Sequence, residues 1–165
     1  MGEARPRRHE GGYALSGRLA SPWLTIRVQF VLAAVFVVAG FGKITDPPGF
    51  AHEIHNYGLV PGVAVNAMAI VLPWIEVVCG LALFLGIARR SSARILGLLL
   101  VVFVIALSIN LIRGKPVDCG CFGTSKVERS QAERLRDMKW AIARDVGLLL
   151  LVGQVLAATR REERI

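Results

Sequence analysis

Two cysteines separated by a single glycine, Cys119-Gly120-Cys121, are the residues of this sequence best suited to covalent chemistry. A disulfide between cysteines so close together requires a sharp bend, which the central glycine permits because it has no side chain. The resulting ring is strained, and strain makes a disulfide easier to reduce and better at oxidising other thiols. The nearby cations Arg113, Lys115 and Lys126 favour the thiolate form, whereas Asp118 opposes it. The triplet therefore predicts a redox-active pair of thiols.

Two other roles for the cysteine pair remain open. The pair could be a permanent bridge that fixes the shape of its loop. Alternatively, it could form a metal site with His52 and His55, which are spaced i and i+3 and so lie on one face of a helix. Two cysteines and two histidines bind zinc or copper, although zinc-binding cysteine pairs are usually two to four residues apart. The redox pair, the bridge and the metal site are three competing predictions.

Glu76 is an ionisable residue inside a long apolar stretch. It lies about 13 residues, or about 20 Å of helix, after Val63, which places it near the middle of a bilayer core of about 30 Å. A charged carboxylate that faces lipid is costly, so we expect Glu76 to face the interior of the bundle, either protonated or paired, with Lys43 and Asn110 as candidate partners. This predicts either a structural hydrogen bond or a partner for a proton or a quinone headgroup, and a quinone is the candidate cofactor. Cys79, one turn further on, is interpreted as a small buried apolar residue.

The elements that must position these residues follow from the composition. Of the 165 residues, 54% are hydrophobic and 19% are charged, and the mean hydropathy is +0.54. This composition excludes an ordinary soluble domain and a disordered chain. Four apolar stretches are long enough to cross a bilayer as helices, at residues 23–42, 63–88, 95–112 and 140–158. We therefore predict an all-α integral membrane protein, a bundle of four transmembrane helices.

The distribution of lysine and arginine predicts the orientation of these helices. Placing both ends of the chain in the cytoplasm puts 11 of the 20 basic residues on that side. The predicted parts are cytoplasmic tails at 1–21 and 159–165, a membrane domain at 22–158, and outer loops at 43–62 and 113–139. The second outer loop ends in a charged stretch, Lys126 to Lys139, which we predict to be a short helix on the membrane surface before the last span. This topology explains the net charge of +8, so no nucleic-acid partner is expected.

Four motifs in a fixed order carry a family resemblance. They are Ala39-Gly40-Phe41-Gly42-Lys43-Ile44-Thr45-Asp46-Pro47, Tyr57-Gly58, Leu72-Pro73-Trp74-Ile75-Glu76 and Asp118-Cys119-Gly120-Cys121-Phe122-Gly123. Together they resemble the methylamine utilisation protein MauE family, in the DoxX-like group, over about residues 25 to 158. The resemblance implies a four-helix protein of the bacterial inner membrane. It also implies work with a thioredoxin-like partner in forming or handling disulfides of exported proteins, originally those of the methylamine dehydrogenase small subunit.

The motifs and the resemblance combine into one functional hypothesis with two alternatives. In the hypothesis, Cys119 and Cys121 act as a thiol-disulfide oxidoreductase at the outer surface and exchange electrons with an extracytoplasmic thioredoxin-like protein, while Glu76 and Lys43 tune the bundle or a quinone site. The first alternative is a metal-binding or transport protein that uses the cysteine pair and the two histidines. The second is a structural subunit of a membrane quinone oxidoreductase.

Overall fold

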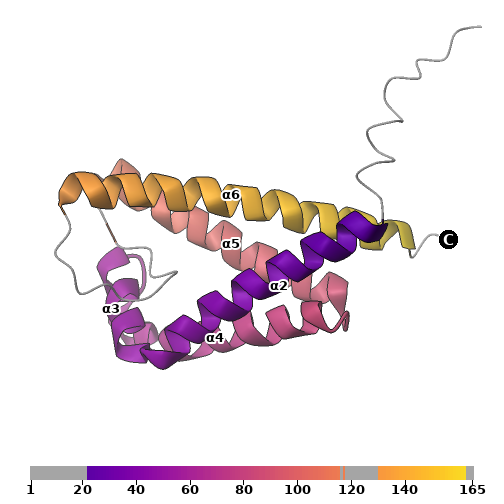
Figure 1. Ribbon diagram of the computed structural model, residues 1–165. Helices are drawn as coiled ribbons and strands as arrows, with labels where there is room; N and C mark the ends of the chain where they lie inside the picture. Colours follow the sequence, from indigo (N-terminus) through magenta and orange to yellow (C-terminus); the bar gives the residue numbers. More distant parts are fainter. Residues whose placement is uncertain (1–21, 116, 118–129, 163–165) are drawn as a thin grey trace, which may run out of the picture.

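A computed structural model describes residues 22–115, 117 and 130–162 of the chain, and within these ranges it contains five α-helices and no strand. The helices are α2 (Pro22–Thr45), α3 (Pro47–Tyr57), α4 (Gly62–Phe84), α5 (Arg89–Ile112) and α6 (Gln131–Glu162) (Figure 1). The prediction of an all-α fold is confirmed for this part of the chain.

Four of these helices, α2, α4, α5 and α6, are long and apolar enough to cross a membrane. Large apolar side chains such as Val63, Leu98 and Leu150 lie exposed on their outer faces. Water would disfavour so much exposed apolar surface, whereas lipid tails accept it. The four predicted spans are therefore confirmed, and we describe the chain as a multi-pass membrane protein.

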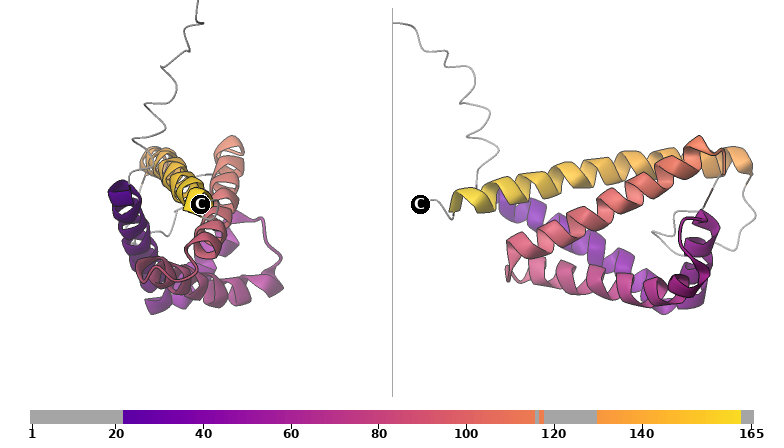
Figure 2. Two further views of the ribbon diagram at one scale, coloured as in Figure 1. Left: turned by 90° about the vertical axis from the view of Figure 1, so that its right-hand side faces the viewer. Right: turned by 180° about the vertical axis from the view of Figure 1, so that it is seen from behind.

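The helices form a wedge that is closed at one end and open at the other. The start of α2 lies beside the end of α6, and the two helices diverge toward α3, which lies across the wide end (Figures 1 and 2). At the narrow end, side chains from all four spans form one apolar core that includes Leu32, Leu83, Leu96 and Val155. The closed end is therefore packed like an ordinary core, and the wide end is where space remains for a site.

Two glycines let α2 and α4 approach each other closely. A Cβ atom added to Gly40 would lie 2.8 Å from Val77 Cγ2 and 2.9 Å from the carbonyl oxygen of Pro73. A Cβ atom on Gly80 would lie 2.9 Å from Val37 Cγ2. Small residues at such positions are typical of membrane helices, because association there depends on close packing. This contact fixes α2 and α4 as one unit.

The helix α3 occupies most of what was predicted as the first outer loop. Asp46 caps it by accepting a hydrogen bond of 3.0 Å from the backbone N–H of Gly49, and Pro47 and Pro48 occupy its first turn. Proline breaks a helix interior but suits the first turn, where its missing N–H needs no partner. The helix ends at Tyr57, and its C-cap Gly58 adopts a left-handed φ of 62°. The residues after Thr45 therefore end α2 and also begin a second, capped helix.

The last helix, α6, is longer than the sequence indicated. Ser130 and Glu133 cap its start reciprocally, because the Ser130 backbone N–H donates to Glu133 Oε2 at 2.9 Å and the Glu133 N–H donates to Ser130 Oγ at 3.3 Å. The helical character expected before Trp140 is present from Gln131 onward. However, this stretch and the last span form one continuous helix, which no proline interrupts. The helix also continues beyond the predicted end of the span at residue 158, as far as Glu162.

The second span ends earlier than expected and the third starts earlier. Helix α4 ends at Phe84, after which Gly86 and Ala88 adopt left-handed φ angles of 73° and 47° and reverse the chain. Helix α5 then begins at Arg89, ahead of the apolar stretch. Hydropathy identifies only the part of a helix that lies in lipid, so the charged first turn of α5 was not included in the predicted span.

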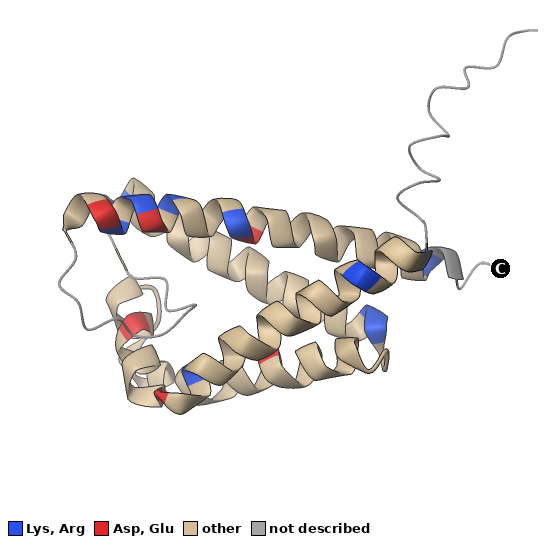
Figure 3. Cartoon of the chain, viewed as in Figure 1, with Lys and Arg blue, Asp and Glu red and all other residues tan. Residues whose placement is uncertain are grey.

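Charge is distributed unevenly along the wedge (Figure 3). At the narrow end the described charged side chains are basic: Arg27, Arg89, Arg90, Arg94 and Arg160. Acidic side chains gather toward the wide end, on α3 and on the first turns of α6, where they alternate with basic ones such as Arg134, Arg136 and Lys139. The two ends of the bundle therefore present different surfaces to the two sides of a membrane.

Candidate functional site

A cavity of about 390 Å³ lies in the wide part of the wedge, lined by side chains from all five helices. Small-molecule sites in proteins are usually of about 300–1,000 Å³, with mostly apolar walls and a few polar groups. Its polar lining residues are Lys43, Glu53, Tyr57, Glu76, Arg144 and Asp145. Most of the other lining residues are aliphatic or aromatic, among them Phe36, Phe50, Leu72 and Phe103. The cavity has the size and composition of a ligand site.

A buried ion pair between Lys43 and Glu76 joins α2 to α4 at the cavity wall. Lys43 Nζ lies 2.7 Å from both carboxylate oxygens of Glu76, and the two side chains are only 7% and 12% exposed. The Lys43 ammonium also lies 5.1 Å from the centre of the Phe50 ring, within the range of a cation–π contact. Of the two partners predicted for Glu76, Lys43 is the one that binds it.

The ion pair joins the last turn of α2 to the middle part of α4. Lys43 lies two residues before α2 ends at Thr45. Glu76 is the fifteenth of the 23 residues of α4, and its Cβ atom would lie 3.2 Å from a Cβ atom on Gly40. That the pair lies near the middle of a bilayer stays a prediction.

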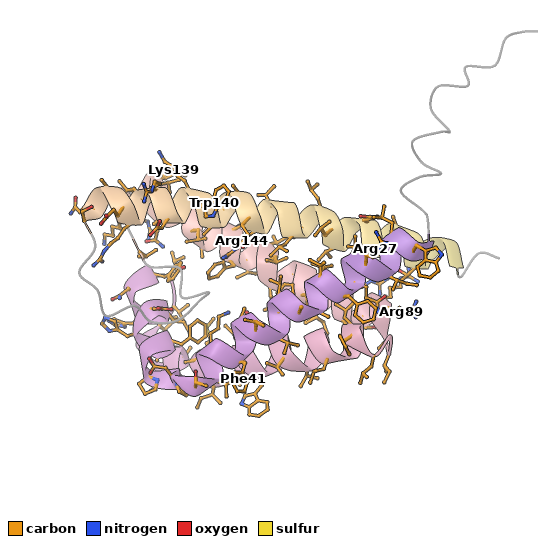
Figure 4. The ribbon with its side chains drawn as sticks, viewed as in Figure 1. Arg27, Phe41, Arg89, Lys139, Trp140 and Arg144 are labelled. Atoms are coloured by element: carbon orange, nitrogen blue, oxygen red, sulfur yellow. The ribbon has the colours of Figure 1, made fainter. Side chains whose placement is uncertain are left out.

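Asp145 is the second buried carboxylate of the cavity, and it is only 2% exposed. Its Oδ1 accepts a hydrogen bond of 3.0 Å from Arg144 Nε and lies 2.9 Å from Arg144 Nη2. Its Oδ2 is buried and has no hydrogen-bond partner among the described residues. Lys43 is close enough for its charge to act on this carboxylate. Figure 4 shows Arg144 reaching from α6 toward the interior of the wedge, whereas Lys139 on the same helix points away.

The cavity holds more acidic than basic groups. Two cationic side chains, Lys43 and Arg144, line it together with three carboxylic acids, Glu53, Glu76 and Asp145. Five ionisable side chains thus line a mostly apolar space, where an ionised group is stable only with a charged or hydrogen-bonding partner.

Asn110 has a different role from the one predicted. It is fully buried on α5, and its Nδ2 donates to the backbone carbonyl of Tyr57 at 3.2 Å and to that of Ala106 at 3.1 Å. The expectation that it pairs with Glu76 is therefore wrong. Since Tyr57 is the last residue of α3, Asn110 instead ties the end of that helix to α5.

A small apolar cluster at the wide end holds Val117, which lies shortly after the end of α5. Val117, which is only 7% exposed, packs in this cluster with Tyr57, Leu107, Met138 and Ala141. The cluster joins α3, α5 and α6, and Tyr57 also lines the cavity. The chain is therefore anchored beside the cavity two residues before Cys119.

The structure describes the two histidines of the predicted metal site but not the two cysteines of the predicted redox pair. Cys119 and Cys121 lie outside the described residues. His52 and His55 are exposed on α3, whereas Glu53, between them, is buried. No group of three or more metal-binding side chains occurs in the described ranges. Cys79 is a free, buried cysteine in the apolar core, as its interpretation as a small apolar residue implies.

Sequence reasoning did not assign three polar groups of the cavity: Glu53, Tyr57 and Asp145. A signal was present for Asp145, because an ionisable residue in an otherwise apolar span is usually functional or paired. Glu53 and Tyr57 gave no such signal, since they belong to a helix that was predicted as a loop. They are placed at the cavity by the packing of α3 against α4.

Comparison with known proteins gives one consistent family. The family model for methylamine utilisation protein MauE matches residues 21–158. A methylamine utilization protein MauE from Methylophilus methylotrophus is 32% identical over 101 residues, which is 61% of this chain and 53% of that protein. The protein of the same name from Methylorubrum extorquens is 31% identical over 134 residues, 80% of this chain and 68% of the relative. The chain thus spans between about half and two thirds of these relatives. No solved structure matches it.

Proposed function

The chain belongs to the methylamine utilisation protein MauE family, and from this membership we propose that it is a membrane component of disulfide formation in exported proteins. In this proposal the Cys119-Gly120-Cys121 triplet exchanges disulfides with an extracytoplasmic thioredoxin-like protein. The clients are exported proteins of the methylamine dehydrogenase type. The protein spans the bacterial cytoplasmic membrane with both ends of the chain inside.

The observation that carries this proposal is the anchoring of Val117 in the apolar cluster beside the cavity. Cys119 follows Val117 by two residues, and two peptide units span at most about 7 Å. In this proposal the reactive triplet therefore acts at the wide end of the wedge. The buried ionisable groups Lys43, Glu76 and Asp145 line the cavity at that end.

The proposed orientation rests on the charge difference between the two ends. The basic residues of the narrow end, including Arg27 and Arg89, together with those of the two sequence tails make up 11 of the 20 in the chain, which fits the cytoplasmic side because basic residues concentrate there. The wide end, with α3 and the start of α6, then faces the extracytoplasmic side. Disulfides form and persist in that compartment. The cysteine triplet and its thioredoxin-like partner would thus meet where their chemistry is supported.

The exchange itself transfers one disulfide between two dithiols. A thiolate of one protein attacks a sulfur atom of the disulfide in the other and forms a mixed disulfide, releasing one thiolate. The second thiolate of the attacking protein then breaks the mixed bond. One protein ends as a disulfide and the other as a dithiol, so atoms and electrons balance without another reactant.

Thiol trapping in intact cells tests the proposal. In a Cys79→Ser background, we expect a membrane-impermeant maleimide to label Cys119 and Cys121 from outside only after mild reduction. A variant that retains one cysteine of the pair, such as Cys121→Ser, should accumulate a mixed disulfide with a thioredoxin-like protein. Single cysteines at two exposed positions of a cysteine-free chain provide the topology control. Ser130→Cys should label from outside, and Ser91→Cys only after the membrane is permeabilised.

Two results would contradict the proposal. If the pair labels fully without reduction and becomes protected when zinc or copper is added, the metal-site alternative with His52 and His55 replaces it. If Ser91→Cys labels from outside and Ser130→Cys does not, the orientation is inverted, and the pair faces the reducing cytoplasm. A Cys119→Ser variant that assembles poorly but leaves all partner thiols unchanged would favour the structural subunit.

A further inference from the structure

We propose that the cavity at the wide end binds the headgroup of a lipid-soluble quinone, with Asp145 as the group that hydrogen-bonds to it and exchanges a proton with it. The binding site is inferred from the described residues alone. Its use as an electron acceptor rests on the proposed function, because the electrons would come from the cysteine pair.

Asp145 is the main indication that a ligand belongs in this cavity. A buried polar atom without a partner is rare in native proteins, because leaving it unsatisfied costs about as much as a lost hydrogen bond. Asp145 Oδ2 is such an atom, while Oδ1 of the same carboxyl group is held by Arg144. The carboxyl group is therefore fixed in place by one oxygen and presents the other for binding.

The chemistry of the open oxygen fits a group that changes from acceptor to donor. A protonated Asp145 donates to a quinone carbonyl, and an ionised Asp145 accepts from a quinol hydroxyl. Lys43 has three N–H donors, of which two point to Glu76, so it also favours negative charge that develops on a bound ring.

The walls of the cavity fit an aromatic ring with an apolar tail. Phe36, Phe50 and Phe103 line it together with leucine and valine side chains, and about 390 Å³ falls within the range of small-molecule sites. A small ion or a metabolite rich in hydroxyl groups would leave this apolar surface unused. A quinone ring carries two oxygen atoms on an otherwise apolar body. It therefore matches a cavity whose lining has few polar and many apolar side chains.

The cavity also lies among membrane-spanning helices. The second half of α2 and the region of α6 around Arg144 line it, and these two helices separate toward α3 (Figures 1 and 2). A site among the spans suits a ligand that travels within the bilayer, such as a quinone with a long hydrocarbon tail.

The redox step balances with the quinone as oxidant. The two thiols of Cys119 and Cys121 form a disulfide and release two electrons and two protons. The quinone takes up both electrons and two protons and becomes a quinol. Asp145 delivers one of these protons to a ring oxygen and is reprotonated afterwards.

Direct binding to a protein without the reactive pair tests the inference. Isothermal titration with decylubiquinone and with menadione is carried out on purified Cys119→Ser/Cys121→Ser protein in detergent micelles, so that a failure of the proposed thiol exchange does not affect the result. We expect saturable binding of at least one quinone, and none of dodecanol, which has a similar tail but no ring. Asp145→Leu should weaken binding about 10-fold, because the hydrogen bond that a protonated Asp145 donates to a quinone carbonyl is lost.

Matched variants separate the cavity from the rest of the bundle. Ala39→Phe fills the cavity and should abolish binding, whereas Ala34→Phe makes the same change on an exposed face of α2 and should leave it intact. Asp137→Leu serves as the control for Asp145→Leu, because Asp137 lies on α6 outside the cavity. If Asp145→Leu does not fold, Ala39→Phe and Ala34→Phe still decide the question.

Three outcomes would overturn the inference: no saturable quinone binding, equal binding by Ala39→Phe and Ala34→Phe, or dodecanol competing as well as the quinones. Thiol exchange that proceeds normally in Ala39→Phe would support the proposed function while removing the quinone from this cavity. Quinone binding in a protein whose cysteines never exchange would leave the cavity assignment standing and reject the thiol function.

Discussion

Breaking the Lys43–Glu76 ion pair from one side should strongly destabilise the bundle. The two groups lie 2.7 Å apart and are almost fully buried, so removing one charge leaves the other without compensation. Such a change costs about 3–5 kcal/mol in the free energy of unfolding. We expect Glu76→Gln and Lys43→Met each to lose this amount. The double variant should lose no more than either single variant, because no uncompensated charge then remains.

The assay is unfolding in mixed micelles, in which the share of a denaturing detergent is raised and helix content is followed by circular dichroism. A complete double-mutant cycle needs four proteins: the unchanged chain, Lys43→Met, Glu76→Gln and the double variant. The interaction energy between the two sites should be at least about 3 kcal/mol. Lys139→Met is the control, since Lys139 is exposed on α6, and we expect it to change stability by no more than about 0.5 kcal/mol.

Two results would refute this reasoning. If the double variant loses the sum of the two single losses, the groups do not interact energetically. If each single variant loses less than about 1 kcal/mol, the pair is hydrated and behaves like an exposed salt bridge. In either case the buried ion pair could not be counted among the fixed elements of the cavity.

Three further variants test the packing around the site. Gly40→Ala should cost about 1–3 kcal/mol in detergent unfolding because its Cβ would collide with α4, whereas Gly42→Ala, with nothing within 4 Å, should be neutral or slightly stabilising; equal effects would contradict the close α2–α4 contact. Gly58→Ala should cost about 1 kcal/mol by straining the left-handed end of α3, and a neutral result would mean that this end is not fixed. Asn110→Ala should cost about 1–3 kcal/mol and speed hydrogen exchange of the last turn of α3; unchanged exchange would show that its bond to Tyr57 does not hold that helix.

The spans could be predicted from the sequence because hydropathy and helix length are local properties. The same holds for the Lys43–Glu76 pair, since two opposite charges in apolar stretches have few other ways to be neutralised. Helix α3 was missed because Asp46-Pro47-Pro48-Gly49 is equally typical of a chain break and of a capped helix start. Local sequence does not decide between them, whereas packing against α4 does.

The remaining site residues depend on how the helices are rotated and inclined. Asn110 lies on α5 within a span, but whether it meets Glu76 or Tyr57 is set by the crossing of α5 with its neighbours. The same is true of Asp145, whose place at the cavity follows from the divergence of α6 from α2. Crossing angles result from side-chain packing across two helices, so a single stretch of sequence does not specify them.

The length of α6 determines how far its first residue stands from the lipid surface. At 1.5 Å per residue its 32 residues extend over about 48 Å, well beyond a bilayer core of about 30 Å. Trp140 is exposed, and tryptophan prefers the boundary between lipid and water, so the nine residues before it project about 14 Å along the helix axis into water. The first turns of α6 are thus a rigid spacer. A water-soluble protein can approach the chain at Ser130 without pressing against the lipid headgroups.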